Sequence, residues 1–369
     1  MKTAPYVSFR HCFIRKIRIY INMKKLLTKA ISLILVLSLA AGLCACGKKD
    51  QRQKFTAGIW GSFDTIISVI AYCDTEEEFS SIKTKAEELF LEYHRLFDIY
   101  NDYEGIVNIK TVNDNAGIAP VKVSEEILDL VEYGKTLYEE TDGNVNIAFG
   151  CVLKIWHEAR ETAETNPGRA YVPDIDLLRE ASKHCNIDDV IVDRAASTVY
   201  LADPEMSLDV GAIAKGFATD LVVDKIKNDG NDCFLITAGT SSIRAVGSKP
   251  DGSSWTSAVE TDPDANLIQI SDRSITTSGI YQRYYEVDGV MYHHIINKDS
   301  LMPEHNYMSV TLITDECGFG DGLSTAVFNM ELKEGLAFVE SHENIYGMWV
   351  LLDGSVVYSD GFKDFIKAK

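Results

Sequence analysis

The chain has 369 residues, with 36 basic and 55 acidic side chains and a formal net charge of −19 at pH 7. A body this acidic is not expected to bind nucleic acid or anionic lipid headgroups non-specifically, and a polyanionic ligand would need a cation to help hold it. The length is enough for one large domain or two modest ones.

The N-terminal segment has the pattern of an export signal. Residues 1–45 hold eight basic residues and no acidic one, and within them Met23-Lys24-Lys25 precedes an uncharged run from Ala30 to Ala41 that is rich in Ile, Leu and Val. That run is too short for a permanent membrane span but has the length of a secretory signal core. We therefore expect residues 1–45 to be a signal peptide whose true start is Met23.

The leader ends in Leu43-Cys44-Ala45-Cys46, which is similar to a bacterial lipobox. Ala45 would fit the cleavage pocket, and the Cys46 thiol would take the lipid. Residues 46–54 are then a lipidated cysteine with a short polar tether, and the protein is anchored on the extracytoplasmic side of the cell membrane. The alternative is a plain signal peptide with an incidental cysteine. Without residues 1–45, the remaining 324 residues carry 28 basic and 55 acidic side chains, a charge of −27.

Hydrophobic spacing and capping residues predict the secondary structure. Helices are expected at 75–96, 124–140, 148–159, 212–227, 319–330 and 333–340, with a loop from 98 to 117. Strands are expected at 66–72, 190–192, 198–201, 207–209, 233–238, 242–247, 255–260, 267–270, 290–296 and 308–313, and a last hairpin pairs 347–352 with 355–358. Asp251-Gly252 and Asp288-Gly289 are hairpin signals.

Strands and helices do not alternate strictly along the chain, and the second half is dominated by adjacent strands. This pattern predicts an α+β fold, a single compact domain over residues 55–369 with a largely antiparallel sheet flanked by helices. The cysteines after Cys46 are odd in number and lack metal or redox spacing, so we expect most of them to be small core residues. They are Cys73, Cys151, Cys185, Cys233 and Cys317.

Three segments have residues that are suited to chemistry. In Leu208–Gly216, Asp209 closes a short strand and Lys215 follows in a helix whose N-terminus favours anions; an N-cap aspartate with a solvated lysine is the plainer interpretation. In Gly320–Ala326, Asp321, Ser324 and Thr325 share one helix face and present oxygen ligands of the kind that Mg²⁺ prefers, although an acid stabilised by the helix dipole would look the same.

The third segment joins a polar turn, Thr276 to Gly279, to a strand that contains His293 and His294. Adjacent strand residues point to opposite faces, so only one histidine can face a given site. A histidine there could act as a general base, but a lone histidine is more often structural.

The order and spacing of these segments resemble the FAD:protein FMN transferase family, also called ApbE, from about Phe63 to Phe328. Leu208–Gly216 is similar to the family's L-D-x-G-x-x-A-K-G motif, Asp321–Thr325 to D-A-L-S-T, and His294-Ile295 to H-I. Further similar stretches are Phe63–Thr65, Phe97–Asn113, Gly143–Asn146 with Trp156, Gly247–Trp255 and Thr277–Gly279.

The resemblance implies a flavin site and a metal site. The residues that it places against FAD are Phe63, Tyr100, Asn144, Val145, Asn146, Asp209, Lys215 and Ile295. Those that it places on Mg²⁺ are the carbonyl of Ala212 with Asp321 and Thr325, and Ser324 as an additional ligand. It also implies that His294 is the catalytic base, with Asp209 as a second catalytic residue.

Three departures from the family pattern concern this site. Asn146 stands where many members have aspartate, Asp64 replaces a glycine in the opening motif, and Ala238–Ser241 replaces the usual Gly-Gly-Asn run. The Asp209–Lys215 and Asp321–Thr325 segments keep the pattern.

The resemblance implies an Mg²⁺-dependent enzyme that transfers FMN from FAD to a Thr or Ser hydroxyl of an acceptor protein and releases AMP. The expected acceptor is an envelope-facing flavoprotein or redox subunit close to the membrane. The alternatives are an FAD pyrophosphatase that gives FMN and AMP, a flavin-binding lipoprotein without turnover, and an extracellular solute-binding lipoprotein, which would need two similar lobes and a hinge.

Overall fold

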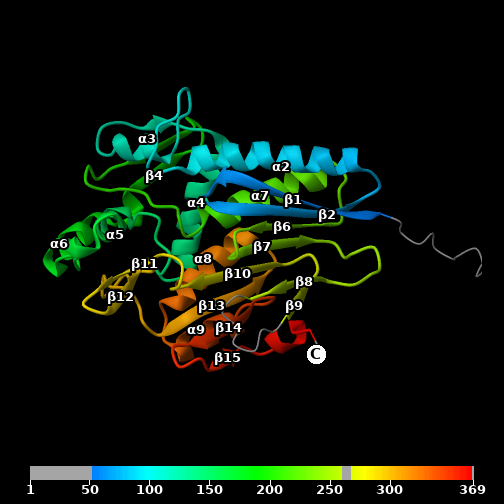
Figure 1. The fold of residues 1–369 in the computed structure, drawn as a ribbon. Coiled ribbons are helices and arrows are strands. Elements are labelled where there is room, and N and C mark those ends of the chain that lie inside the picture. The colour runs from blue at the N-terminus through cyan, green and yellow to red at the C-terminus, as the bar shows by residue number, and fades with distance from the viewer. Residues whose placement is uncertain (1–51, 260–266, 368–369) are drawn as a thin grey trace, which may run out of the picture. The chain divides into compact units, whose positions relative to one another are not determined.

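An eight-stranded sheet forms the centre of the computed structural model, which describes residues 52–259 and 267–367 (Figure 1). Every neighbouring pair of its strands is antiparallel, as the sequence predicted. In spatial order the strands are β1 (Gln53–Ser62), β2 (Thr65–Cys73), β6 (Phe234–Ala238), β7 (Ser242–Val246), β10 (Ser274–Gly279), β13 (Tyr307–Thr314), β14 (Tyr346–Leu351) and β15 (Val356–Tyr358).

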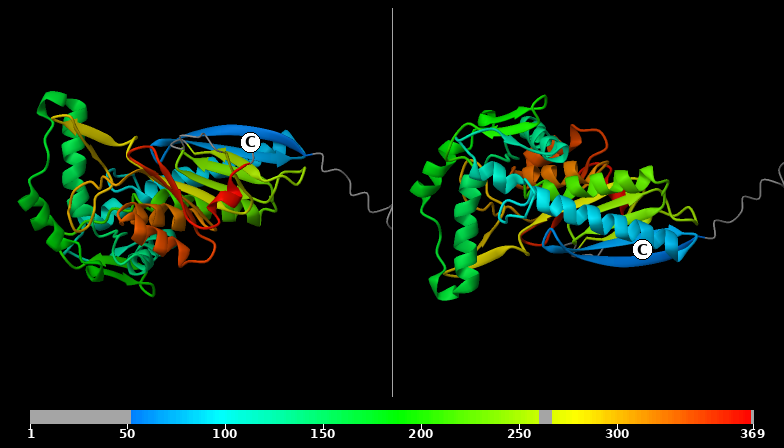
Figure 2. Two further views of the ribbon diagram at one scale, coloured as in Figure 1. Left: turned by 90° about the horizontal axis from the view of Figure 1, so that it is seen from below. Right: turned by 90° about the horizontal axis from the view of Figure 1, so that it is seen from above.

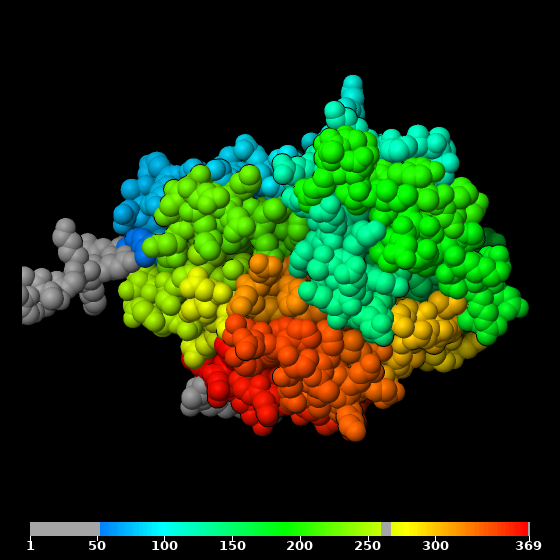
Figure 3. All heavy atoms as spheres, turned by 180° about the vertical axis from the view of Figure 1, so that it is seen from behind, coloured from blue at the N-terminus to red at the C-terminus, as the bar shows by residue number. Residues whose placement is uncertain are grey.

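Helices cover one face of this sheet because alternate strand residues are apolar on that side. Ile67, Val69 and Ala71 of β2 all join the larger hydrophobic core. The helices that contribute buried residues to this core are α2 (Glu76–Phe97), α3 (Ile109–Asp114), α4 (Glu125–Glu140), α7 (Ala214–Asn228), α8 (Cys317–Phe328) and α9 (Leu332–Glu340). On the face shown in Figure 3, the surface of α4 lies directly beside that of α8 and α9.

The opposite face of the sheet packs on a second, smaller core. Leu235 and Ile313 point into it, together with Trp255 and Phe362. It is closed by the hairpin of β8 (Trp255–Ala258) and β9 (Leu267–Ile270) and by the 3₁₀ turn η4 (Phe362–Phe365).

A third group of elements flanks the end of the sheet (Figure 2). Helices α5 (Gly150–Thr165) and α6 (Ile175–Ala181) share an apolar cluster with the hairpin of β11 (Tyr284–Val287) and β12 (Val290–His293). A small sheet of β3 (Val121–Lys122), β5 (Thr198–Leu201) and β4 (Val190–Asp193) lies near α3 (Ile109–Asp114). The remaining 3₁₀ turns are η1 (Pro167–Arg169), η2 (Ser182–His184) and η3 (Ile187–Asp189).

Several local predictions differ from the structure. The predicted strand 207–209 is only a single parallel bridge between Ser207 and Phe149, because the chain turns at once towards α7. Helix α3 lies within the predicted loop 98–117, where Asn108 caps it. Asp251-Gly252 is a turn but not a hairpin, since β8 pairs with β9. The polar segment at 276–279 is the end of strand β10 rather than a turn, because threonines suit a pleated strand.

The N-terminal predictions fall mostly on residues that the structure does not describe. The signal peptide and the lipidation site Cys46 lie outside the described residues, and β1 already begins at Gln53, two residues inside the predicted tether. Within the described parts of the chain, no helix combines the length and the apolar character needed to cross a membrane.

Candidate active site

A buried carboxylate, that of Asp321, lies where α7 and α8 approach each other. Its Oδ1 accepts a hydrogen bond from Ser242 Oγ at 2.7 Å, and its Oδ2 lies 3.3 Å from Lys215 Nζ. Lys215 also contacts the Ser242 hydroxyl. Burial raises the pKa of Asp321, while the charge of Lys215 opposes that rise. Lys215 and Asp321, which the sequence placed in two separate segments, therefore belong to one centre although they are 106 positions apart.

Gly216 makes this approach possible. A Cβ atom at that position would lie 2.5 Å from the carbonyl oxygen of Cys317 and 2.8 Å from Asp321 Oδ2, both closer than a carbon atom can stand. The glycine of the Lys215-Gly216 pair thus sets the separation of α7 from α8, and so the position of the carboxylate.

Hydroxyl groups surround the next turn of α8, as the helical spacing predicted. Ser324 Oγ and Thr325 Oγ1 donate to the backbone carbonyl of Asp321 at 3.0 and 3.2 Å. Ser278 of β10 lies 2.8 Å from Ser324 Oγ and 3.2 Å from Thr325 Oγ1. These three hydroxyls therefore form a cluster of hard oxygen atoms on the turn of α8 that follows Asp321.

This donor set is compatible with Mg²⁺, which takes few protein ligands and completes its shell with phosphate oxygens and water. In the described part of the chain no group of three or more His, Cys, Asp or Glu side chains could hold a metal, so a cation here would depend on the single carboxylate and the hydroxyls. Ala212, whose carbonyl is the remaining predicted ligand, is exposed on the turn before α7.

Asp209 lies at a second centre, called the basic centre because the charges of His157, Arg160 and Arg283 act on it. Its backbone N–H donates to Ile147 O at 2.8 Å, and its Oδ1 accepts from the Gly211 N–H at 2.8 Å. Burial raises the pKa of Asp209, and the charges of His157, Arg283 and Arg160 oppose that rise.

The backbone before Asp209 is fixed by a side chain from α3. The amide of Asn113 brackets Leu208, donating to its carbonyl at 3.0 Å and accepting from its N–H at 2.7 Å. The Asn113 side chain therefore makes the backbone hydrogen bonds of Leu208 that a neighbouring strand would have made in the predicted strand 207–209.

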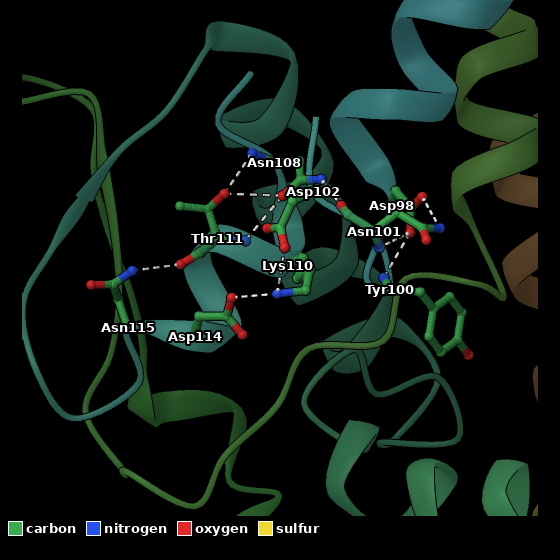
Figure 4. Close-up of polar contacts among 9 residues, drawn as sticks. All are labelled: Asp98, Tyr100, Asn101, Asp102, Asn108, Lys110, Thr111, Asp114 and Asn115. Atoms are coloured by element: carbon green, nitrogen blue, oxygen red, sulfur yellow. Dashed lines mark hydrogen bonds and ion pairs between the residues drawn. The ribbon is translucent and has the colours of Figure 1, made fainter. Parts of the chain in front are cut away.

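Tyr100 is presented by a loop that Asp98 organises (Figure 4). The Asp98 carboxylate accepts from the backbone N–H of Tyr100 at 2.6 Å and of Asn101 at 3.1 Å, and Asn108 ties the far side of the loop to the Asn101 carbonyl at 2.9 Å. The Tyr100 ring stacks on His157 of α5, with ring centroids 4.8 Å apart and planes 26° apart. Tyr100 is 55% exposed, so the outer part of its ring remains accessible.

The two adjacent histidines have different environments. The predicted strand 290–296 ends at His293 and His294 lies in the bend that follows, so strand alternation does not decide their orientations. His293 is buried, accepting from the Ile295 N–H at 3.2 Å and donating to the Glu304 carbonyl at 2.5 Å. His294 is half-buried, and its Nδ1 lies 3.3 Å from the carbonyl of Arg283. Since a carbonyl can only accept, Nδ1 carries the proton and Nε2 is left as the basic nitrogen. Burial lowers the pKa of His294 to about 3, with Arg283 adding to the effect, so the ring is neutral at neutral pH.

The other predicted flavin contacts are more dispersed. Phe63 has a left-handed backbone (φ 53°) in the β1–β2 turn and packs edge-on against Phe90 and His94. Ile295 is buried beside His293.

The segment 144–146 is held mainly by internal hydrogen bonds. Asn144 donates to the carbonyl of Thr141, and the backbone of Val145 donates to the hydroxyl of Thr141. The Asn146 amide donates to the Cys185 carbonyl at 2.9 Å and accepts from the Ala148 N–H at 2.9 Å. The segment leads into Ile147, whose carbonyl accepts the N–H of Asp209, and the Asn146 side chain has two backbone partners.

Sequence reasoning missed five residues of these two centres: Ser242, Ser278, His157, Arg160 and Arg283. Ser278 lay in a segment that the sequence singled out but assigned to a turn. Arg283 joins the centre through the loop 281–283, where Gln282 donates to Thr240 of the altered Ala238–Ser241 loop at 2.8 Å. The other residues carry no local signal, because only the fold brings them to Asp209 or Asp321.

Comparison with known proteins gives one consistent result. The model of the ApbE family matches residues 63–349. The FAD:protein FMN transferase of Treponema pallidum is 29% identical over 312 residues, covering 77% of this chain and 84% of its own length, and that of Klebsiella pneumoniae is 29% identical over 278 residues, covering 72% and 84%. The crystal structure of the ApbE protein of Thermotoga maritima superposes with a TM-score of 0.75 at 25% identity, covering 86% of this chain and all of that one.

Proposed function

Because this chain belongs to the ApbE family, we propose that it is an enzyme that transfers FMN from FAD to a hydroxyl group of another protein. The acceptor would be a Thr or Ser hydroxyl, which attacks the FMN-side phosphorus while AMP leaves. The observation that carries this proposal is the buried centre of Asp321, Lys215 and Ser242, with the hydroxyls of α8 beside it. Because the protein is strongly acidic, such a centre can bind a negatively charged diphosphate only if cations bind with it.

We propose that Mg²⁺ is that cation, held by Asp321, Thr325 and the carbonyl of Ala212, with Ser324 as an additional ligand. When bound, it would neutralise charge that develops on the diphosphate in the transition state. Lys215 lies 3.3 Å from the same carboxylate and supplies a fixed positive charge. Among the described residues no group of three or more His, Cys, Asp or Glu side chains could hold a metal, so oxygens of the substrate and water would complete the cation's shell.

The basic centre would receive the rest of the substrate. The charges of His157, Arg283 and Arg160 oppose the rise of the pKa of Asp209, and these three side chains would offer positive charge to this part of the substrate. The half-exposed Tyr100 ring, stacked on His157, offers an aromatic face against which a planar heterocycle can pack.

His294 is proposed as the base that takes the proton of the acceptor hydroxyl. It is neutral, and its Nε2 is free of the hydrogen bond that fixes Nδ1. A pKa of about 3 is low for a base at neutral pH, and the negative charge of a bound diphosphate acts to raise it. We propose Asp209 as the second catalytic residue, because the charges of Arg283 and Arg160 act on the pKa of both Asp209 and His294.

Two other activities of the same site remain alternatives. Water in place of the acceptor hydroxyl would make the protein an FAD pyrophosphatase, and loss of turnover would make it a flavin-binding lipoprotein, for which the altered Ala238–Ser241 loop is the best argument. A solute-binding lipoprotein is disfavoured because Gln51–Lys369 form one compact unit rather than two lobes.

Product analysis separates these activities. The purified protein is incubated with FAD and Mg²⁺, with and without detergent-solubilised membrane proteins of the source organism as acceptors. A transferase gives covalent flavin on a protein band together with AMP, and Asp321→Asn abolishes both. Equal release of free FMN and AMP without acceptors identifies a pyrophosphatase, and FAD binding with no product in either case identifies a binding protein.

We also propose that Cys46 carries a lipid and holds the site on the extracytoplasmic side of the cell membrane. The lipobox-like sequence supports this proposal, and a tether of at most six residues from Gly47 to Arg52 would keep the site near the bilayer surface. The acceptor would then be an envelope-facing flavoprotein or redox subunit. Mass spectrometry of the mature N-terminus tests this: we expect a diacylated Cys46, and Cys46→Ala should release the protein from membranes, whereas an unmodified cysteine would refute the anchor.

A further inference from the structure

Two partly buried thiols from distant parts of the chain meet beside the site. Cys151 is the second residue of α5, and Cys185 lies in the loop between η2 and η3. Their Sγ atoms are 3.1 Å apart, although the residues are separated by 34 positions. The other cysteines in the described part of the chain, Cys73, Cys233 and Cys317, are buried. The expectation that the cysteines are mostly inert core residues therefore does not extend to this pair.

The Sγ of Cys151 lies in the first turn of α5, where backbone N–H groups stabilise negative charge. As a thiol it donates to the backbone carbonyls of Ala181 at 3.0 Å and His184 at 3.7 Å, so forming its thiolate gives up these two contacts. His184 is itself held by Asp203, with Nδ1 and Oδ2 2.7 Å apart, and that hydrogen bond raises the pKa of His184. The hydrogen bond from Cys185 is the main cause that lowers the pKa of Cys151. Two thiols in contact, one of them at a helix N-terminus, are the arrangement of redox-sensitive cysteines.

We propose that Cys151 and Cys185 form a reversible disulfide by exchange with an external low-molecular-weight disulfide. The Cys151 thiolate attacks one sulfur of that disulfide, breaks its S–S bond and expels one thiolate. Cys185 then loses its proton and attacks Cys151 Sγ, which expels the second thiol and closes the protein disulfide. Two protein thiols are oxidised and one external disulfide is reduced to two thiols, so the step needs no other oxidant.

The geometry requires little movement. The two sulfur atoms must approach from 3.1 Å to about 2.0 Å, which small rotations of the two side chains can supply. Both sulfur atoms also lie near the Ala181 carbonyl, at 3.0 Å from Cys151 Sγ and 3.7 Å from Cys185 Sγ, so the two thiols occupy one pocket.

The disulfide would link the first turn of α5 to the loop between η2 and η3, next to the segments that hold the basic centre around Asp209. The Cys185 carbonyl accepts the Asn146 amide, and the next residue, Ile147, holds the backbone of Asp209. Helix α5, which begins at this joint, carries His157 and Arg160. A covalent link between Cys151 and Cys185 therefore ties the start of α5 to the loop on which Asn146 rests. This inference stands on the thiol geometry and does not depend on the proposed transferase activity.

The test uses the full-length purified chain with oxidised glutathione in large excess, followed by acid quenching, alkylation and peptide mass mapping. We expect a crosslinked peptide pair that contains Cys151 and Cys185 and has lost two hydrogen atoms, and its return to free thiols on reduction. Before oxidation, Cys151 should alkylate at least about tenfold faster than buried Cys73. The crosslinked protein should melt on the order of 5 °C higher than the reduced one.

Three variants sharpen the result. In Cys185→Ser, oxidation should stop at a stable glutathione adduct on Cys151, whereas in Cys151→Ser the remaining Cys185 should stay largely free. The matched control Cys73→Ala should form the crosslink as the unaltered chain does. The proposal is overturned if the unaltered chain accumulates a glutathione adduct with Cys185 still free, or if both thiols remain reduced, and the peptide map of that chain decides this even if a variant does not fold.

Discussion

Replacing Gly216 with alanine is a direct probe of how α7 and α8 position the Asp321 carboxylate. Gly216 is the third residue of α7, and the added methyl group would lie 2.5 Å from the Cys317 carbonyl and 2.8 Å from Asp321 Oδ2. A backbone carbonyl cannot rotate away as a flexible side chain can. The two helices must therefore separate, and the carboxylate must move away from Lys215 and Ser242.

The expected cost follows from two opposing effects. Alanine is favoured over glycine in a helix by about 1 kcal/mol, while overpacking a close contact costs about 1–3 kcal/mol. Because the contact here is with backbone, we take the upper part of that range and expect a net loss of about 2 kcal/mol in the free energy of unfolding. Gly335→Ala in α9 is the matched control: its methyl group would come no closer than 3.4 Å to Trp349, so it should leave the stability equal or raise it by up to about 1 kcal/mol.

Urea unfolding at equilibrium measures both variants, and FMN transfer at saturating FAD measures the site. Gly216→Ala should lose stability and most of its activity and need a higher Mg²⁺ concentration for what remains, whereas Gly335→Ala should retain full activity. If Gly216→Ala were as stable and as active as the unaltered protein, the account of the α7–α8 contact would be wrong.

Three further substitutions and one pH series test other parts of the structure. His294→Asn should reduce FMN transfer by about 10²–10⁴-fold, measured as initial rates, without changing the unfolding midpoint. Burial lowers the pKa of His293 from 6.5 to about 4, so the unfolded chain takes up this proton at a higher pH than the folded chain does. The stability that the neutral, buried His293 contributes is therefore complete above pH 6.5, and about 3 kcal/mol of it is lost by pH 4. Urea unfolding at several pH values should show a smaller dependence of stability on pH in His293→Gln. Asp220 accepts the N–H groups of Cys317 and Gly318 at 3.0 and 2.7 Å, so Asp220→Ala should cost about 1–2 kcal/mol by the loss of this cap of α8, and an unchanged thermal midpoint would argue against it.

The parts of the site that were predictable from sequence are those that local periodicity decides. Asp321, Ser324 and Thr325 fall on one face of α8 because residues three and four apart on a helix are neighbours. Here a few consecutive residues contain all the information that is needed. His293 and His294 do differ in environment, but strand alternation is not the reason, because β12 ends at His293 and His294 lies in the bend that follows.

The parts that were not predictable depend on contacts between distant segments. Ser242 and Ser278 come from two strands of the sheet, and their serines look ordinary until β7 and β10 pair beside α8. The Cys151–Cys185 pair has no recognisable spacing, because α5 and the loop after η2 bring the two thiols together.

Strand assignment failed for a different reason in two places. Residues 207–209 are apolar and polar in alternation, but the chain turns after Asp209 and its backbone bonds go to Ile147 and Asn113 instead of a sheet. Thr276–Gly279 looks like a polar turn, yet it belongs to β10, which pairs with β13 along its whole length and with β7 over Ser274–Thr276. The sheet therefore decides its conformation.

Covalent flavin on an acceptor protein is the most direct test of the central proposal. Membrane proteins from the source organism are separated on denaturing gels, with the protein present, deleted, or replaced by Asp321→Asn, and flavin-fluorescent bands are identified by mass spectrometry. The account predicts a band that carries FMN in phosphoester linkage to a Thr or Ser, present only when the unaltered protein is. A band that persists in the deletion strain or with Asp321→Asn, or the lack of covalent flavin in all three samples, would contradict it.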